Sequence, residues 1–232
     1  MMYPHVGSFL LASLSWAAVL PLLGATLPAA ETEAPDVAGL PRVLLLGDSI
    51  SIGYTAPVQA RLKGRANVHH GGEGRFDSGY ALAHLDSWLG AGKWTVIHFN
   101  YGLWDIKYVD SQGADGLVAT GTLIGSQASY ERNLRAIVKR LQRTGAKLIF
   151  ATTTPVPDGT PSRIKDTELP LNAFAVRLMK EKGIPIDDLH AYVMPRLAEL
   201  QLPKNVHFKP AGDEALGDAV AASILAALSG AL

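Results

Sequence analysis

Two residues far apart in the chain, Ser49 and His207, have the types needed for nucleophilic chemistry. Ser49 follows an apolar run, residues 43–46, and the pair Gly47-Asp48, at a point where a helix can begin. This places a hydroxyl at the end of a buried strand, beside the amide N–H groups of a helix start. A serine held there can attack an acyl carbon while the amides stabilise the developing oxyanion. The alternative is an ordinary strand–turn–helix in which Ser49 only caps the helix.

His207 lies in a loop that precedes the last amphipathic stretch of the chain. A serine hydroxyl is not ionised at neutral pH, so a base must take its proton during attack, and imidazole suits that task. No carboxylate stands at a spacing that would support a metal site at His69 and His70. Three other histidines are interpreted as structural or surface residues: His84, His98 and His190.

The composition excludes several classes of function. The chain has 232 residues, with 21 basic and 21 acidic side chains and no cysteine. The charge balance gives no argument for a nucleic-acid partner, and the lack of cysteine excludes disulfides and thiolate chemistry. The length is sufficient for one domain with a sizeable core.

The first 30 residues differ from the rest of the chain. They contain no Lys, Arg, Asp or Glu, and residues 9–23 are nearly all apolar. This pattern predicts a signal peptide over residues 1–30 and export to the periplasm or beyond. A retained membrane anchor is the alternative, and only in that case do we expect contact with a membrane. Residues 31–41 are predicted to be a linker, and the folded domain is expected at 42–232.

Strand-like apolar runs alternate with helical periodicity after the leader. This alternation predicts an α/β fold, a three-layer α/β/α sandwich around a parallel sheet of about five strands. Residues 110–129, rich in small and polar side chains, are expected to form a long loop. The expected strands are residues 43–46, 68–70, 95–99, 147–152 and 184–187, and the expected helical faces lie within 82–89, 130–141 and 216–228.

Ligands of such sheets bind outside the carboxyl ends of the strands. Ser49 lies in the first loop at that edge, and His207 lies in the last. We therefore expect the two side chains to meet there.

Four motifs in this order make a resemblance specific. Gly47-Asp48-Ser49 and Val206-His207-Phe208 flank residues 99–105 (FNYGLWD) and 152–157 (TTTPVP). The chain thereby resembles the SGNH (GDSL-type) hydrolase superfamily, in particular a branch of exported, carbohydrate-linked esterases. The likeness runs from about residue 42 to residue 228. It implies the flavodoxin-like fold of that superfamily.

The resemblance also implies roles for individual residues. Ser49 would be the nucleophile that forms an acyl-enzyme, and His207 would be the general base. The backbone amides of Ser49 and Gly74 would donate to the oxyanion. The family's third donor is an asparagine at the position of Trp104, so the side chain of Asn100 is the predicted replacement.

The acid that normally stands three residues before the histidine is also missing, because Lys204 occupies that position. Asp77, Asp105 and Asp188 are the candidates for a carboxylate from elsewhere, although Asp105 is expected to tie loops together. Asn205 stands beside Lys204, but an amide cannot stabilise an imidazolium as a carboxylate does.

Aromatic residues in the same loops predict a substrate pocket formed by Tyr54, Tyr101 and Trp104, since aromatic faces suit sugar rings and apolar acyl chains. The alternative is that such side chains simply pack the bases of the loops.

The sequence therefore predicts a serine esterase that cleaves a small ester, for example an O-acetyl group on a glycan, without a metal or organic cofactor. The main alternative is a non-catalytic glycan-binding or scaffold protein on the same fold. A phosphate or nucleotide binder ranks last, because Asp48 stands where a glycine-rich phosphate loop is needed. The acyl group, the alcohol and the oligomeric state are left open.

Overall fold

The computed structural model describes residues 36–72, 74 and 77–231, which lie in one compact unit spanning Pro35–Leu232. The predicted leader lies outside the described residues. Among the helices that are described, none is both long and apolar enough to cross a membrane.

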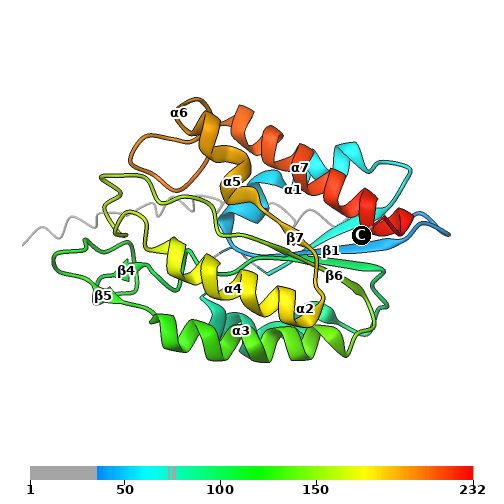
Figure 1. The fold of residues 1–232 in the computed structure, drawn as a ribbon, viewed down its shortest axis with the longest axis horizontal. Helices are drawn as coiled ribbons and strands as arrows, with labels where there is room; N and C mark the ends of the chain where they lie inside the picture. Colours follow the sequence, from blue (N-terminus) through cyan, green and yellow to red (C-terminus); the bar gives the residue numbers. More distant parts are fainter. Residues whose placement is uncertain (1–35, 73, 75–76, 232) are drawn as a thin grey trace, which may run out of the picture. The chain divides into compact units, whose positions relative to one another are not determined.

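Five parallel strands form the central sheet in the order β2-β1-β3-β6-β7 (Figure 1). Strands β1, β3 and β6 are buried almost throughout, as expected for parallel strands with both faces covered. The predicted three-layer fold with five parallel strands is confirmed. The strands are β1 (Arg42–Leu46), β2 (Asn67–Gly71), β3 (Val96–Phe99), β6 (Lys147–Ala151) and β7 (Ile186–Asp187).

The strand order decides which helices cover which face of the sheet. Along the sheet, the chain moves in one direction from β1 to β2. It moves in the opposite direction in each later step, from β2 to β3, from β3 to β6 and from β6 to β7. Because such crossovers are right-handed, the two sets of helices fall on opposite faces. Helix α1 (Ser49–Arg61) thus covers one face, and α2 (Ser78–Leu89), α3 (Gln127–Gln142) and α4 (Glu168–Lys182) cover the other. The last helix, α7 (Pro210–Ser229), packs beside α1 (Figure 1).

Three short helical segments connect β7 to the segment before α7. They are α5 (Leu189–Val193), the 3₁₀ helix η1 (Met194–Arg196) and α6 (Leu197–Leu200). An isolated bridge joins Gln201 to Phe208, and the Gln201 side chain donates to the carbonyl oxygen of Val206 at 3.1 Å. These contacts fix both ends of the loop that carries His207.

Residues 36–41, part of the predicted linker, are attached to the domain. Asp36 forms an ion pair of 2.7 Å with Arg42, and its other carboxylate oxygen lies 2.7 Å from His69 Nε2. The backbone N–H of Val37 donates to Asn67 Oδ1 at 2.9 Å, and the Asn67 amide donates back to the Val37 carbonyl at 3.0 Å. The chain is therefore ordered by contacts with β2 before β1 begins.

The predicted long loop over residues 110–129 is folded back on itself. A short antiparallel pair, β4 (Tyr108–Val109) with β5 (Thr122–Leu123), closes it. The backbone N–H of Tyr108 donates to the Ser162 carbonyl at 2.8 Å, so the segment is also tied to the connection between β6 and α4.

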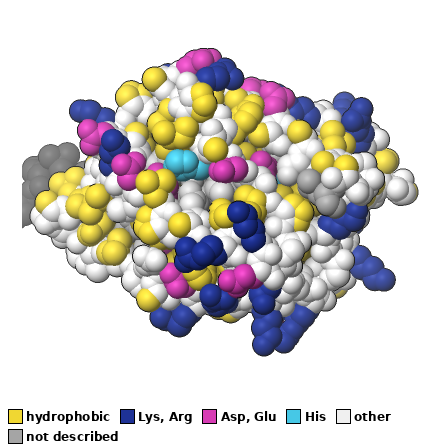
Figure 2. Space-filling model, in the orientation of Figure 1, with side chains coloured by type: hydrophobic (Ala, Val, Ile, Leu, Met, Phe, Trp, Pro, Cys, Tyr) yellow, Lys and Arg dark blue, Asp and Glu magenta, His cyan; other side chains and the backbone are white. Residues whose placement is uncertain are grey.

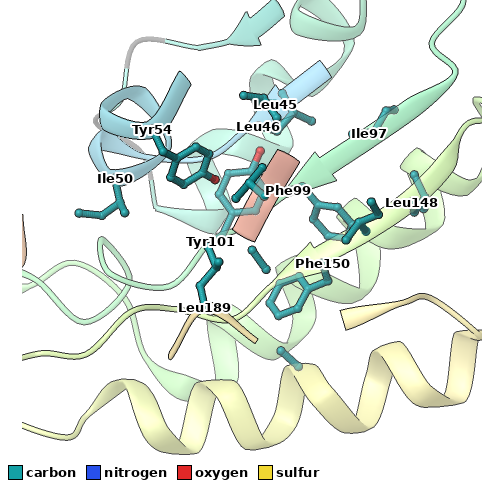
Figure 3. Packing of buried hydrophobic residues seen from close by; sticks show 14 of the residues in the cluster. Leu45, Leu46, Ile50, Tyr54, Ile97, Phe99, Tyr101, Leu148, Phe150 and Leu189 are labelled. Atoms are coloured by element: carbon teal, nitrogen blue, oxygen red, sulfur yellow. The ribbon is translucent and has the colours of Figure 1, made fainter. Parts of the chain in front are cut away.

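The core between the layers is built from side chains of all the long elements. Phe99 on β3 and Phe150 on β6 meet edge to face with their ring centroids 5.4 Å apart. Figure 3 shows Tyr54 and Tyr101 in the same cluster, beside Ile50 and Leu189.

Leu45 in the middle of β1 provides a test of this packing. It is fully buried, so Leu45→Ala should lower the free energy of unfolding by about 2–5 kcal/mol through lost burial and a cavity. Leu169→Ala on α4 is the matched control, because that side chain is 44% exposed and its truncation should change stability by less than about 0.5 kcal/mol. Urea denaturation of both variants measures the difference, and equal losses would contradict the described core.

Candidate active site

Ser49 is held by a tight turn between β1 and α1. A side chain at Gly47 would approach Ser51 Oγ to 2.9 Å and the Asn100 carbonyl oxygen to 3.3 Å, so the turn has no room for one. Asp48 caps the helix, since its Oδ1 accepts the N–H of Ile50 at 3.0 Å. Ser49 is the first helical residue, and its N–H has no acceptor within the helix.

The structure brings Ser49 and His207 together across 158 positions of sequence, with Ser49 Oγ 2.9 Å from His207 Nε2. The other ring nitrogen, Nδ1, lies 2.8 Å from Asn205 Oδ1, which also accepts the backbone N–H of His207 at 3.0 Å. Because this amide oxygen can only accept, Nδ1 carries the proton and Nε2 is free to accept the Ser49 hydroxyl. The arrangement is that of a nucleophile, a base and an orienting group.

The orienting group is an amide, not a carboxylate. The side chain of Lys204 lies against Gly159. Asp77 accepts N–H groups of Gly79 and Tyr80 at the start of α2, so it serves as a helix cap. Asp188 likewise caps α5 and accepts the Thr152 hydroxyl at 2.9 Å. These contacts give Asp77 and Asp188 structural tasks.

Asp105 joins the loop after β3 to the start of α2. Its carboxylate accepts both the backbone N–H and the hydroxyl of Ser78. Its backbone carbonyl accepts the N–H of Gly125 at 3.1 Å. Burial raises the pKa of Asp105 to about 7, and the Ser78 hydrogen bonds oppose this shift. These are the contacts that the loop-tie interpretation requires.

A cavity of about 440 Å³ opens beside the Ser49–His207 pair. Its walls come from the loops after β1, β2 and β3, the folded-back loop, the connection after β6 and the loop before α7. The lining residues are Asp48, Ser49, Gly74, Leu103, Trp104, Lys107, Gly113, Ala114, Asp115, Arg163, Val206 and His207. The residues from the 110–129 segment give that loop a direct part in the site.

Among the described residues, two buried cations line this cavity. Arg163 is 7% exposed, and its Nε donates to the carbonyl oxygen of Leu103 at 2.7 Å. Lys107 is 5% exposed, forms an ion pair with Asp115 and stands 3.6 Å from the ring centre of Trp104.

The pKa of His207 is lowered. Its main cause is desolvation of the ring, and the positive charges of Arg163 and Lys107 lower it further, while Asp115 opposes them. A lowered pKa keeps the imidazole neutral, and therefore able to accept a proton, at a more acidic pH than usual.

Two of the predicted oxyanion donors, the Ser49 amide and Gly74, belong to the cavity. Gly74 has a φ of +81°, and a side chain there would collide with Ile52 and lie 3.5 Å from Ser49 Cα. Only glycine permits this close approach. The Asn100 amide instead donates to the Ala151 carbonyl at 2.7 Å and to Thr153 Oγ1 at 3.4 Å. Both of its N–H groups thus have acceptors on β6 and just beyond, so we do not assign Asn100 to the oxyanion site.

The predicted aromatic pocket needs correction at two positions. Tyr54 and Tyr101 are each 1% exposed and belong to the core, as Figure 3 shows. Tyr101 follows β3 and packs in the core cluster, and its carbonyl accepts the hydroxyl of Tyr130 at 3.1 Å. Trp104 alone of the three lines the cavity.

Sequence reasoning missed several residues around the cavity. Nothing in the sequence separates Arg163 and Lys107 from the other basic residues, since only the fold buries them at the site. Asn205 was visible beside Lys204, and its two-residue spacing from His207 is the signal that marks it. A second serine–histidine contact, Ser51 Oγ to His70 Nε2 at 2.7 Å, lies on the buried side of α1 and was not predicted.

Within the described residues, no group of three or more His, Asp or Glu side chains could hold a metal ion.

No family model and no curated protein sequence matches this chain. Solved structures do match. A lipase/acylhydrolase from Enterococcus faecalis shares 19% identity, with a TM-score of 0.66 over 80% of this chain and 95% of that one. The acetylxylan esterase Axe2 from Geobacillus stearothermophilus shares 18% identity, with a TM-score of 0.64 over 79% and 94% of the two chains. A GDSL-like lipase from Bacteroides thetaiotaomicron shares 18%, with a TM-score of 0.62 over 86% and 93%.

The chain therefore has the fold of the SGNH (GDSL-type) lipases and esterases, as the sequence motifs predicted. The match extends over 93–95% of each of these three structures. The likeness therefore covers the complete fold and not a single motif.

The His207–Asn205 contact makes a prediction about protonation. NMR titration should give His207 a pKa below the usual 6.5, because burial and two cations disfavour the imidazolium. Asn205→Asp should raise that pKa by about one unit or more, because a carboxylate would then face Nδ1–H. An unchanged His207 pKa in Asn205→Asp would contradict the contact.

Proposed function

We propose that this protein is a serine esterase that cleaves a small ester through an acyl-enzyme on Ser49. The observation that carries the proposal is the hydrogen bond of 2.9 Å between Ser49 Oγ and His207 Nε2 at the mouth of a cavity. The shared fold with known lipases and esterases supports it.

The chemistry follows from the geometry. Ser49 Oγ attacks the ester carbonyl carbon as its proton passes to His207 Nε2, while Asn205 Oδ1 holds the Nδ1–H. The resulting imidazolium returns the proton to the departing alcohol. Water then attacks the acyl carbon while His207 Nε2 takes its proton. The imidazolium gives this proton to Ser49 Oγ as the bond between the acyl carbon and Oγ breaks, which releases the acid and restores the serine. The N–H of Ser49, at the start of α1, and the N–H of Gly74 are the proposed donors to the oxyanion.

An O-acetyl group on a glycan is the proposed substrate type. The similar structures include acetylxylan esterases, and the ring of Trp104 at the cavity wall offers a face suited to a sugar. An acetyl ester also suits a site whose base has an amide partner, because esters need less activation than amides.

Export through the leader is part of the same proposal. Mass spectrometry of the mature protein would test it, since removal of the leader should leave an N-terminus between residues 26 and 31.

A non-catalytic glycan-binding protein is the competing function, and the specific feature in its favour is Trp104 at the position of the family's oxyanion asparagine. The two functions differ in the reactivity of Ser49. Only an activated serine reacts with a fluorophosphonate probe, so rapid labelling of Ser49 supports the esterase.

Ser49→Ala should abolish hydrolysis of p-nitrophenyl acetate and fluorophosphonate labelling, because the nucleophile is removed. Its melting temperature should stay within a few degrees of the wild type. Ser51→Ala is the control, since Ser51 contacts His70 and not His207; its hydroxyl is not the proposed nucleophile and labelling should persist. Undiminished turnover in Ser49→Ala would rule out the mechanism.

Asn205→Asp should increase kcat for p-nitrophenyl acetate at pH 8 by about tenfold or more, because a carboxylate stabilises the imidazolium formed in the transition state. The higher His207 pKa should also move the acid limb of the pH–rate profile to higher pH, since only the neutral imidazole accepts a proton. Asn205→Ala removes the acceptor and should lower kcat. A profile that is identical in all three proteins would remove Asn205 from the mechanism.

A further inference from the structure

Arg163 is an unusual side chain for the wall of a cavity. It is 7% exposed, yet no carboxylate of the described residues lies within ion-pair distance of its guanidinium. A buried cation without a partner is costly, and proteins keep such groups mainly where a ligand supplies the opposite charge.

Part of the guanidinium is available to a ligand. Nε donates to the Leu103 carbonyl at 2.7 Å, and Nη1 donates to Ser162 Oγ at 3.3 Å. These bonds use two of the five N–H groups and fix the plane of the fork that the guanidinium N–H groups form. The remaining N–H groups belong to a side chain that lines the same cavity as Ser49 and His207.

The other charged groups at the cavity bear on what the fork can bind. Lys107 is paired with Asp115 and packs on Trp104. Asp48 is buried, its Oδ1 accepts the N–H of Ile50, and burial raises its pKa. His207 is kept neutral by its lowered pKa. Asp48 and Asp115 attract the Arg163 guanidinium electrostatically. Among the described residues, however, neither forms an ion pair with it, so its remaining N–H groups have no carboxylate acceptor.

We propose that Arg163 recognises a carboxylate on the substrate, so that the preferred ester is an acidic one. A planar carboxylate matches the fork of arginine in a way that a lone ammonium does not offer. A dianionic phosphate would suit the cavity less, because Asp48 and Asp115 also line it. This selectivity for an acidic substrate would come from Arg163 itself and not from the overall charge of the protein. Basic and acidic side chains are interspersed on the face drawn in Figure 2, and the chain has 21 of each.

The preference for an acidic ester rests on the proposed esterase function. Binding of the anion by Arg163 does not, because it can be measured without catalysis. In the Ser49→Ala protein, the probes are benzoate and its neutral counterpart benzamide. Their binding is measured by calorimetry and by the change in tryptophan fluorescence that is lost in a Trp104→Phe background, because Trp104 lines the cavity. Benzoate should bind at least tenfold more tightly than benzamide. Arg163→Gln should remove this difference, whereas Arg143→Gln, an exposed change at the far end of α3, should preserve it.

The catalytic arm uses three esters that differ in charge. Phenyl acetate is neutral, 3-acetoxybenzoate carries a carboxylate on the alcohol part, and monophenyl succinate carries one on the acyl part. The wild type should prefer one of the acids over phenyl acetate in kcat/KM, and the preferred ester tells which part of the substrate faces Arg163. Arg163→Gln should lower the ratio of kcat/KM for the preferred acid to kcat/KM for phenyl acetate at least tenfold, through a higher KM for the acid, and Arg163→Lys should retain part of this ratio.

The outcomes separate the two proposals. If no ester is hydrolysed but benzoate binds through Arg163, the esterase fails and the anion site stands. If Arg163→Gln lowers kcat equally for all three esters, the guanidinium supports the reaction itself and the recognition proposal is overturned. Equal binding of benzoate and benzamide would also overturn it. Should Arg163→Gln not fold, the Arg163→Lys protein and the wild-type preference among the three esters decide.

Discussion

The site depends on one hydrogen bond between Ser49 and His207, which joins the first loop at the carboxyl edge of the sheet to the last one. Neither residue could hold the other in place alone. Ser49 is fixed by a turn without room for a side chain and by the cap of α1, and His207 is fixed by its own loop and by Asn205. Helices α1 and α7 pack against each other directly behind the pair, so the geometry is carried by rigid elements.

The parallel sheet explains why two distant segments meet. All five strands end at one edge, and β1 lies between β2 and β3, where the chain reverses the direction in which it adds strands. The loop after β1 therefore opens into a crevice, which is where ligands of such sheets bind. The cavity beside Ser49 stands at this position.

Much of this could be predicted from the sequence. The apolar runs and helical faces are patterns that extend over whole elements. They predicted the five strands, the layers and the loop positions of Ser49 and His207. Residues whose surroundings depend on packing could not be placed in this way. Tyr54 and Tyr101 looked like loop aromatics, but both are buried, because Tyr54 lies on the core-facing side of helix α1 and Tyr101 packs in the core after β3. The Asn100 amide is taken by Ala151 and Thr153, which become its neighbours only when β3 and β6 pair. Arg163 is distinguished by its burial alone.

The amide at position 205 has a further chemical consequence for an esterase built on this pair. An imidazole that is less inclined to hold a proton removes one from serine less readily, but its conjugate acid is the stronger donor. In acylation, departure of the alkoxide would therefore be faster, and attack by the serine would be slower. Such a balance suits esters of weakly acidic alcohols, such as the hydroxyls of sugars, whose departure is the harder half of the step.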